Sequence, residues 1–198
     1  MVIFERSLLI RLFSRGIIAS SVLLMMGCSN LTESKPLFEQ SESLTRKQVL
    51  LQLQCQKTDN STSVELTPPE LYQRMTECVD EQNYRSATLL FALAGSYSWY
   101  DAAKVNTAFA KNQHTRLLAD NFAKLNSKQR DALWAHIQST LGDPRQLSAV
   151  CDNLRLVGRP HYDAVYMKQK GDAYSGREGA QQQRWDMALD SYLHCSAT

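Results

Sequence analysis

Residues 67–95, TPPELYQRMTECVDEQNYRSATLLFALAG, contain the pattern that decides the fold class of this chain. Thr67 and the two prolines after it form a helix start, because threonine caps the first turn and proline has a backbone angle that suits it. Apolar residues then recur at helical spacing, pause around Asn83 and resume until Gly95. Since glycine commonly ends a helix, the stretch predicts two antiparallel helices joined at Asn83, with the second ending at Gly95.

The rest of the body continues this pattern. Asn126, followed three positions later by glutamine, is typical of a helix start, and the Gly-Asp-Pro sequence at 142–144 ends that helix. Another helix is expected before the Gly-Arg-Pro break at 158–160, and one more after it, over residues 162–173. We therefore expect residues 45–198, enough for one domain, to be all-α, with antiparallel helical hairpins stacked in a short repeat-like or irregular bundle.

Two of the expected helices share a spacing of aromatic and small side chains. The same offsets occur in Tyr84, Ala87, Phe91 and Ala94 and in Trp185, Ala188, Tyr192 and Cys195. This order resembles the second helix of a tetratricopeptide-type or Sel1-like repeat, and the residues before the second copy resemble a Sel1-like loop: Gly171, Tyr174, Gly176 and Gly179. The resemblance implies stacked hairpins over residues 68–97 and 163–195. An irregular helical bundle is the alternative.

The amino terminus has the composition of an export signal. Three arginines come first, and an apolar run over residues 17–26 follows that is too short to span a membrane. Gly27, Cys28 and Ser29 come next. The segment resembles a bacterial lipoprotein signal ending in a lipobox. This resemblance implies removal of residues 1–27, a diacylglyceryl group on Cys28 and, because Ser29 follows, attachment to the outer membrane facing the periplasm. The alternative is an ordinary cysteine beside a cleavage site.

Residues 28–44 are polar and contain a proline, which predicts a flexible tether that holds the domain on the order of 20 Å from its anchor. The chain has 22 basic and 20 acidic residues, and removal of residues 1–27 takes away three arginines and one glutamate, leaving 19 of each. A neutral body lacks the cationic field that binds nucleic acid. We expect no nucleic-acid partner, and membrane contact through the lipid anchor.

The remaining cysteines are even in number, as expected in an oxidising compartment: Cys55, Cys78, Cys151 and Cys195. Two disulfides are predicted. Three connectivities are possible, and closing the shorter loops first would join Cys55 to Cys78 and Cys151 to Cys195. None of the four forms a CxxC pair, which disfavours a thiolate metal site. We expect no metal and no cofactor other than the lipid.

Catalytic patterns are not found in the sequence. The four histidines lie outside HExxH and paired metal spacings, and GxSxG and phosphate-loop patterns do not occur. The one cluster of interest is His161-Tyr162-Asp163, which would offer a base, a phenol and a carboxylate. A turn at the start of a helix explains it more simply. We therefore predict that the protein is not an enzyme.

Recognition of another protein is the remaining class of function. Tyr97, Trp99 and Tyr100 surround an expected helix junction, and exposed aromatics of this kind form interface hot spots. The alternative is that they fill the core. Arg177 lies in the glycine-bearing loop before the last helix, a second candidate contact for which a disordered insertion is the alternative.

The carboxyl-terminal run WDMALDSYLHC, residues 185–195, is similar to that of small immunity lipoproteins with Sel1-like helical character. That resemblance implies an inhibitor of a toxic secretion-system effector, such as a lipase or another enzyme that attacks the envelope. A tether would confine the inhibitor to the layer where the effector acts. The alternative is a helical-repeat lipoprotein that serves as a scaffold for envelope assembly or transport.

Overall fold

The computed structural model describes residues 44–55, 66–174 and 180–195, all within one compact unit of the chain, Lys35–Thr198. Over these ranges the protein is all-helical and contains no strand, as predicted. The helices are α1 (Arg46–Gln52), α2 (Pro68–Asp80), α3 (Tyr84–Val105), α4 (Ala108–Phe122), α5 (Ser127–Leu141), α6 (Pro144–Val157) and α7 (Gln181–Leu193), with one 3₁₀ turn, η1 (Val165–Met167). The predicted signal, Cys28 and most of the tether lie outside the described residues.

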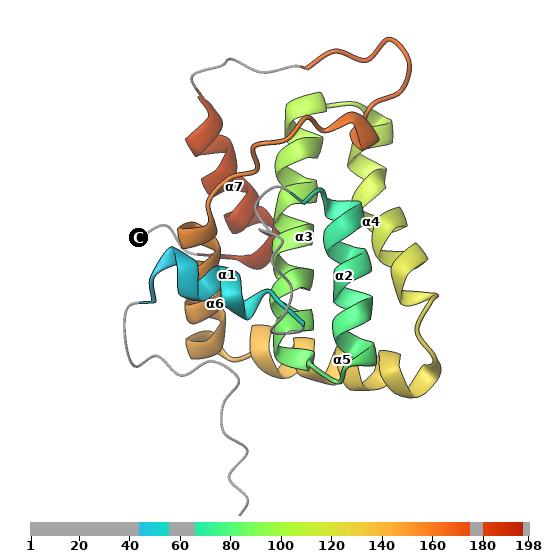
Figure 1. The fold of residues 1–198 in the computed structure, drawn as a ribbon. Helices are drawn as coiled ribbons and strands as arrows, with labels where there is room; N and C mark the ends of the chain where they lie inside the picture. The colour runs from blue at the N-terminus through green and yellow to red at the C-terminus, as the bar shows by residue number, and fades with distance from the viewer. Residues whose placement is uncertain (1–43, 56–65, 175–179, 196–198) are drawn as a thin grey trace, which may run out of the picture. The chain divides into compact units, whose positions relative to one another are not determined.

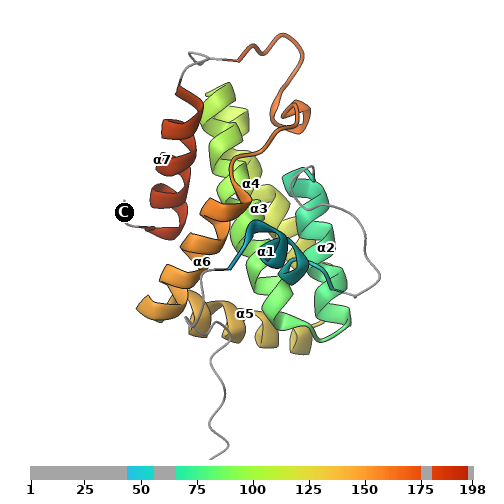
Figure 2. The ribbon, with the colours of Figure 1, turned by 60° about the vertical axis from the view of Figure 1, so that its left-hand side comes forward.

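Helix α3 is the centre of this bundle (Figures 1 and 2). It packs against α2, α4, α5 and α7, and α5 runs across the ends of α2 and α3 at the bottom of Figure 1. The sequence of α3 explains this position, because it has no charged residue between Arg85 and Asp101 and is buried along nearly that whole length. A helix that is apolar on all sides lies in the interior of a protein.

The predicted helix starts are confirmed by their hydrogen bonds. The backbone N–H of Thr67 donates to Glu70 Oε2 at 2.7 Å, and hydrogen bonds from Thr67 lower the pKa of Glu70. The N–H of Gln129 donates to Asn126 Oδ1 at 3.0 Å, and Gln129 Oε1 accepts from the Asn126 N–H. Asn83 likewise caps α3. Each cap satisfies donors that the first helical turn leaves without partners.

The predicted end of the second helix at Gly95 is wrong, because α3 continues to Val105. Gly95 is buried, and the Tyr192 ring of α7 lies directly over it. A Cβ atom at this position would be 2.0 Å from Tyr192 Cε1. Glycine is required here for the close approach of two helices, and packing along α3 outweighs the cost of about 1 kcal/mol of a glycine within a helix.

Gly95→Ala should lower the free energy of unfolding by about 2 to 3 kcal/mol, because the added methyl group must displace the Tyr192 ring. In a Tyr192→Ala background the same change should instead raise it by up to about 1 kcal/mol, since alanine is the better helix former. Urea unfolding of the four chains measures both effects. Equal effects of Gly95→Ala in the two backgrounds would contradict the predicted contact.

The helix expected over residues 162–173 is also absent. After α6 the described chain contains only η1 before residue 175. Gly158 has φ of 85°, and the hydroxyls of Tyr162 and Tyr166 both donate to Asp101 of α3, which holds this segment in an irregular path along α3. The hairpin that the repeat resemblance implied over residues 163–195 therefore lacks its first helix within the described residues. Helix α7 packs on α3 instead.

Two disulfides join Cys55 to Cys78 and Cys151 to Cys195, which confirms the pairing expected from the shorter loops. The first connects the segment after α1 to α2, and the second connects α6 to the residues after α7. Because α6 and α7 share few other contacts, the second bond is a principal link between these two helices.

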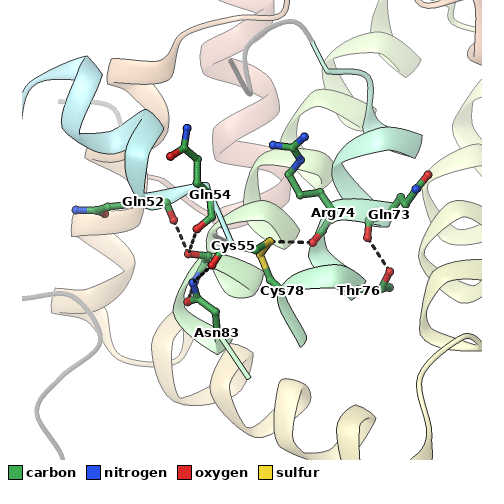
Figure 3. The surroundings of a disulfide bond; sticks show 9 residues. Gln52, Gln54, Cys55, Gln73, Arg74, Thr76, Cys78 and Asn83 are labelled. Atoms are coloured by element: carbon green, nitrogen blue, oxygen red, sulfur yellow. Dashed lines mark hydrogen bonds between the residues drawn. A yellow bond between two sulfur atoms is a disulfide. The ribbon is translucent and has the colours of Figure 1, made fainter. Parts of the chain in front are cut away.

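Figure 3 shows how the end of α1 is held at the first disulfide. The Ser86 hydroxyl lies 2.7 Å from the Gln52 carbonyl oxygen and 3.1 Å from that of Gln54, and it donates to this pair. Asn83 Nδ2 donates to the Cys55 carbonyl at 3.3 Å. Side chains at the start of α3 thus satisfy carbonyls that the short helix α1 leaves open at its end.

Candidate partner-binding groove

A groove of about 430 Å³ lies over α3, between α4 and α7. Its lining comprises Ser98, Trp99, Ala102 and Ala103 of α3, Asn106 just after α3, Lys111 and His114 of α4, and Arg184, Met187, Ala188 and Ser191 of α7. Trp99 and Met187 are 42% and 60% exposed. Two large apolar side chains from different helices are therefore open to solvent at one groove.

Helical periodicity brings these residues together. The four α7 residues in the lining are spaced at 184, 187, 188 and 191, which places them on one face of a helix. Trp99, Ala102 and Ala103 of α3 have the same spacing, which places them on one face of that helix. Since Ala102, Ala103 and Ala188 have short side chains, the helices pack closely and still leave space beside Trp99.

Other aromatic rings pack next to Trp99. The Trp99 ring lies 6.2 Å from that of Tyr192, which in turn meets the His114 ring edge to face at 5.0 Å. His114 Nδ1 lies 3.3 Å from the Tyr72 hydroxyl. Burial lowers the pKa of His114, so the ring is neutral at pH 7. Trp99 thus rests on a packed base, which reduces the entropy lost when a partner contacts it.

Two cations lie at the groove, Lys111 on α4 and Arg184 on α7. Lys111 is exposed, and the Arg184 guanidinium lies over the Tyr100 ring, 5.5 Å from its centroid. Neither forms an ion pair within the described residues. The described lining includes no Asp or Glu. The groove therefore combines an apolar floor with positive charge on two sides.

The structure separates the three aromatics that the sequence grouped as candidate contacts. Tyr97 is 0% exposed and Tyr100 is 4% exposed, so the prediction that they contact a partner is wrong. Tyr97 donates to the Gly158 carbonyl at 3.0 Å and packs edge to face on Trp185. Trp99 alone remains accessible. The fourth candidate, Arg177, lies outside the described residues.

The other groove residues were missed from the sequence. Met187 and Arg184 share a helical face with Ala188, a signal present in the sequence, but an exposed face cannot be told from a buried one by spacing alone. Lys111 and His114 belong to α4, whose large apolar residues are all only half-buried. Their position beside Trp99 depends on how α4 packs against α3.

A second cluster of ionisable groups is centred on Asp101. This carboxyl group is 1% exposed and accepts hydrogen bonds from Tyr162 at 2.8 Å and Tyr166 at 2.7 Å. Burial raises its pKa to about 7, against the opposing effects of the two hydroxyls and Lys104. These bonds fasten the segment after α6 to α3, so the cluster has a clear structural role.

The cluster His161-Tyr162-Asp163 does not form a catalytic arrangement. The Tyr162 hydroxyl is directed to Asp101, whereas His161 and Asp163 are exposed in the turn. Among the residues that the structure describes, no three His, Cys, Asp or Glu side chains are grouped so that they would hold a metal ion. Within the same ranges, no helix has the length and apolar character needed to cross a membrane.

The chain was compared with protein-family models, with curated proteins and with solved structures. No family model matches it, and no curated protein or solved structure does either.

Proposed function

We propose that this protein is an exported, lipid-anchored inhibitor that binds a toxic effector through the groove between α4 and α7. The observation that carries the proposal is the groove itself, because Trp99 and Met187 are both exposed in its lining and the Trp99 ring packs against that of Tyr192. Tryptophan in such a setting is among the side chains that contribute most to protein interfaces.

The two disulfides support the compartment in this proposal. Bonds of this kind persist in oxidising spaces such as the bacterial periplasm and are rare in the cytosol. They agree with the signal expected to end at Cys28. A lipid on that cysteine and a tether up to residue 44 would confine the domain to a thin layer at the membrane, which raises its effective concentration against an effector acting there.

An inhibitor needs a stable binding face and no chemistry of its own. The groove provides such a face, and a tightly bound domain would block access to the active site of an envelope-attacking enzyme, with a lipase as the first class to test. The similarity of residues 185–195 to immunity lipoproteins supports this choice over the scaffold, because Met187 and Ala188 of that run line the groove.

Cells lacking the protein should be killed on contact with parental cells that deliver the effector, and the parent gene should restore survival. Trp99→Ala should fail to restore it and should weaken binding to the purified effector at least about tenfold, because truncating a hot spot costs 2 kcal/mol or more. Trp134→Ala is the matched control, since Trp134 is 48% exposed on α5 and does not line the groove. It should protect as well as the parent.

If the protein is instead a scaffold, different results are expected. Loss of a scaffold should cause an envelope defect in pure culture, measured as sensitivity to detergent, without any attacking cell. A deletion strain with that defect, together with full survival in contact with the parent, would contradict the inhibitor proposal. The gene next to this one is the first place to look for an exported effector.

Cys28→Ala should abolish lipid attachment and signal removal, because the thiol is the acceptor in a lipobox. We expect an unprocessed product that is lost from the outer-membrane fraction, while the helical domain folds normally. Fractionation with metabolic labelling by palmitate measures this, with the parent chain as control. A normally processed and labelled Cys28→Ala product would overturn the lipoprotein assignment.

A further inference from the structure

We infer that the groove between α4 and α7 takes an acidic amphipathic segment of its protein partner, with an aliphatic or aromatic side chain seated beside Trp99 and flanking carboxylates directed to Lys111 and Arg184. This inference rests on the proposed function, because it names the chemistry of the partner at the same site.

The floor of the groove selects an apolar side chain. Ala102, Ala103 and Ala188 offer few polar atoms there, and Trp99 and Met187 add exposed apolar surface to the lining. The volume of about 430 Å³ accommodates more than one large side chain. Methionine adapts its shape to different partners, whereas tryptophan has fewer rotatable bonds and its ring here packs against that of Tyr192. The lining therefore combines an adaptable apolar side chain with a stiffer one.

The charges select carboxylates. Lys111 comes from α4 and Arg184 from α7, so the two cations flank the apolar floor on α3. His114 adds no positive charge at pH 7, because burial lowers its pKa. On α7, Asp186 and Asp190 line a different hollow, beside α6, and are absent from the described lining of this groove. The charged side chains described in the lining are thus all positive, although the body expected after signal removal has equal numbers of acidic and basic residues.

Charge pairs at an interface rim act mainly on specificity and on the rate of association. A segment with basic residues beside its apolar anchor would bring like charges together at Lys111 and Arg184, which disfavours binding. Acidic segments are favoured for the opposite reason. The groove should therefore distinguish partners by charge as well as by the apolar side chain.

Selection of displayed random peptides on the purified full-length chain in detergent tests this inference. Peptides with an aliphatic or aromatic residue between Asp or Glu should be enriched, and their binding should weaken as salt rises. The double variant Lys111→Glu/Arg184→Glu should bind these peptides at least about tenfold more weakly and should enrich basic peptides instead. Lys47→Glu/Lys128→Glu, the same charge change on exposed lysines of α1 and α5, should behave as the parent.

Three results would overturn the inference: no enrichment above the library on the parent chain, enrichment of neutral or basic peptides, or a charge preference unchanged by the Lys111→Glu/Arg184→Glu variant. Association of the chain with itself, or binding of phospholipid vesicles that is lost in Trp99→Ala, would identify a different occupant and also overturn it. The same variants show whether the proposed function or only this inference has failed. If Trp99→Ala abolishes protection while the charge-reversed variant protects fully, the inhibitor stands and the acidic segment does not.

Discussion

Removal of the Cys151–Cys195 disulfide by Cys151→Ala/Cys195→Ala should lower the free energy of unfolding by about 4 kcal/mol. The bond closes a loop between residues 44 apart in sequence, and a loop of that size restricts the unfolded chain by about this amount. Alanine suits both positions because both cysteines are buried. Urea unfolding at equilibrium measures the loss, which is a large fraction of the stability of an ordinary domain.

Hydrogen exchange can show whether loss of this bond loosens α7 in particular or destabilises the whole domain. Helix α7 packs mainly on α3, and the bond ties its end to α6. Hydrogen exchange should therefore become faster in α7 of the double variant than in α2 or α5. The matched control is Cys55→Ala/Cys78→Ala, whose loop of 23 residues gives a loss of about 3.4 kcal/mol and faster exchange in α1. A Cys151→Ala/Cys195→Ala chain as stable as the parent would contradict the prediction.

The second large effect concerns pH. The parent chain should lose stability through Asp101 as pH rises from about 4 to about 7, and Asp101→Asn should abolish that loss. Burial raises the pKa of Asp101 to about 7 in the folded protein, from 3.8 for the free side chain. A change of roughly three pKa units corresponds to about 4 kcal/mol. Asparagine keeps an oxygen that accepts from Tyr162 and Tyr166 but never carries the charge.

The direction follows from proton binding. Between pH 3.8 and about 7 the folded carboxyl group keeps its proton while the unfolded one has lost it, so the native state binds more protons. Stability therefore falls as pH rises through this range, and no further loss is expected above it. The contribution is fully present below the unfolded pKa and is lost as pH passes the folded one.

Other groups titrate nearby, so the difference between the parent and Asp101→Asn is the quantity to measure. The lowered pKa of His114 makes stability rise with pH below its usual value of 6.5, which opposes Asp101. Glu70 affects the pH dependence of stability only below about pH 4.5, the usual pKa of its side chain. Urea unfolding at several pH values should show the two chains diverging in favour of Asp101→Asn as pH rises. Parallel curves would contradict a buried, protonated Asp101.

Features set by residues close together along the chain were predicted correctly, whereas several features set by distant contacts were not. Capping residues interact within a few positions along the chain, and so Thr67 and Asn126 were identified correctly as helix starts and Asn83 as the junction between two helices. Gly95 was misread, because the glycine that commonly ends a helix serves here to admit a ring from residue 192. Residues 162–173 were misread because contacts with Asp101 outweigh their local helical period.

Of the residues described as lining the groove, only Trp99 was among the predicted partner contacts. The aromatics at 97–100 were placed at a helix junction, but in a continuous helix each residue turns by about 100°, so Trp99 points about 160° away from Tyr97. Tyr97 and Tyr100 share the side that meets Trp185. If a continuous helix had been predicted through residues 97–100, the turn between residues would have placed Trp99 on a different side from Tyr97 and Tyr100.

The sequence by itself determined the helical class, several helix boundaries and the four cysteines that form disulfides. Those cysteines pair in the way that closes the shorter loops. These depend on periodicity, on caps and on chain entropy, all of which act along the chain. Only the tertiary structure decided where α3 ends, which aromatic is exposed and which cations flank it. Those features depend on contacts between α3, α4 and α7, and the burial of a side chain is set by neighbours that are distant in sequence.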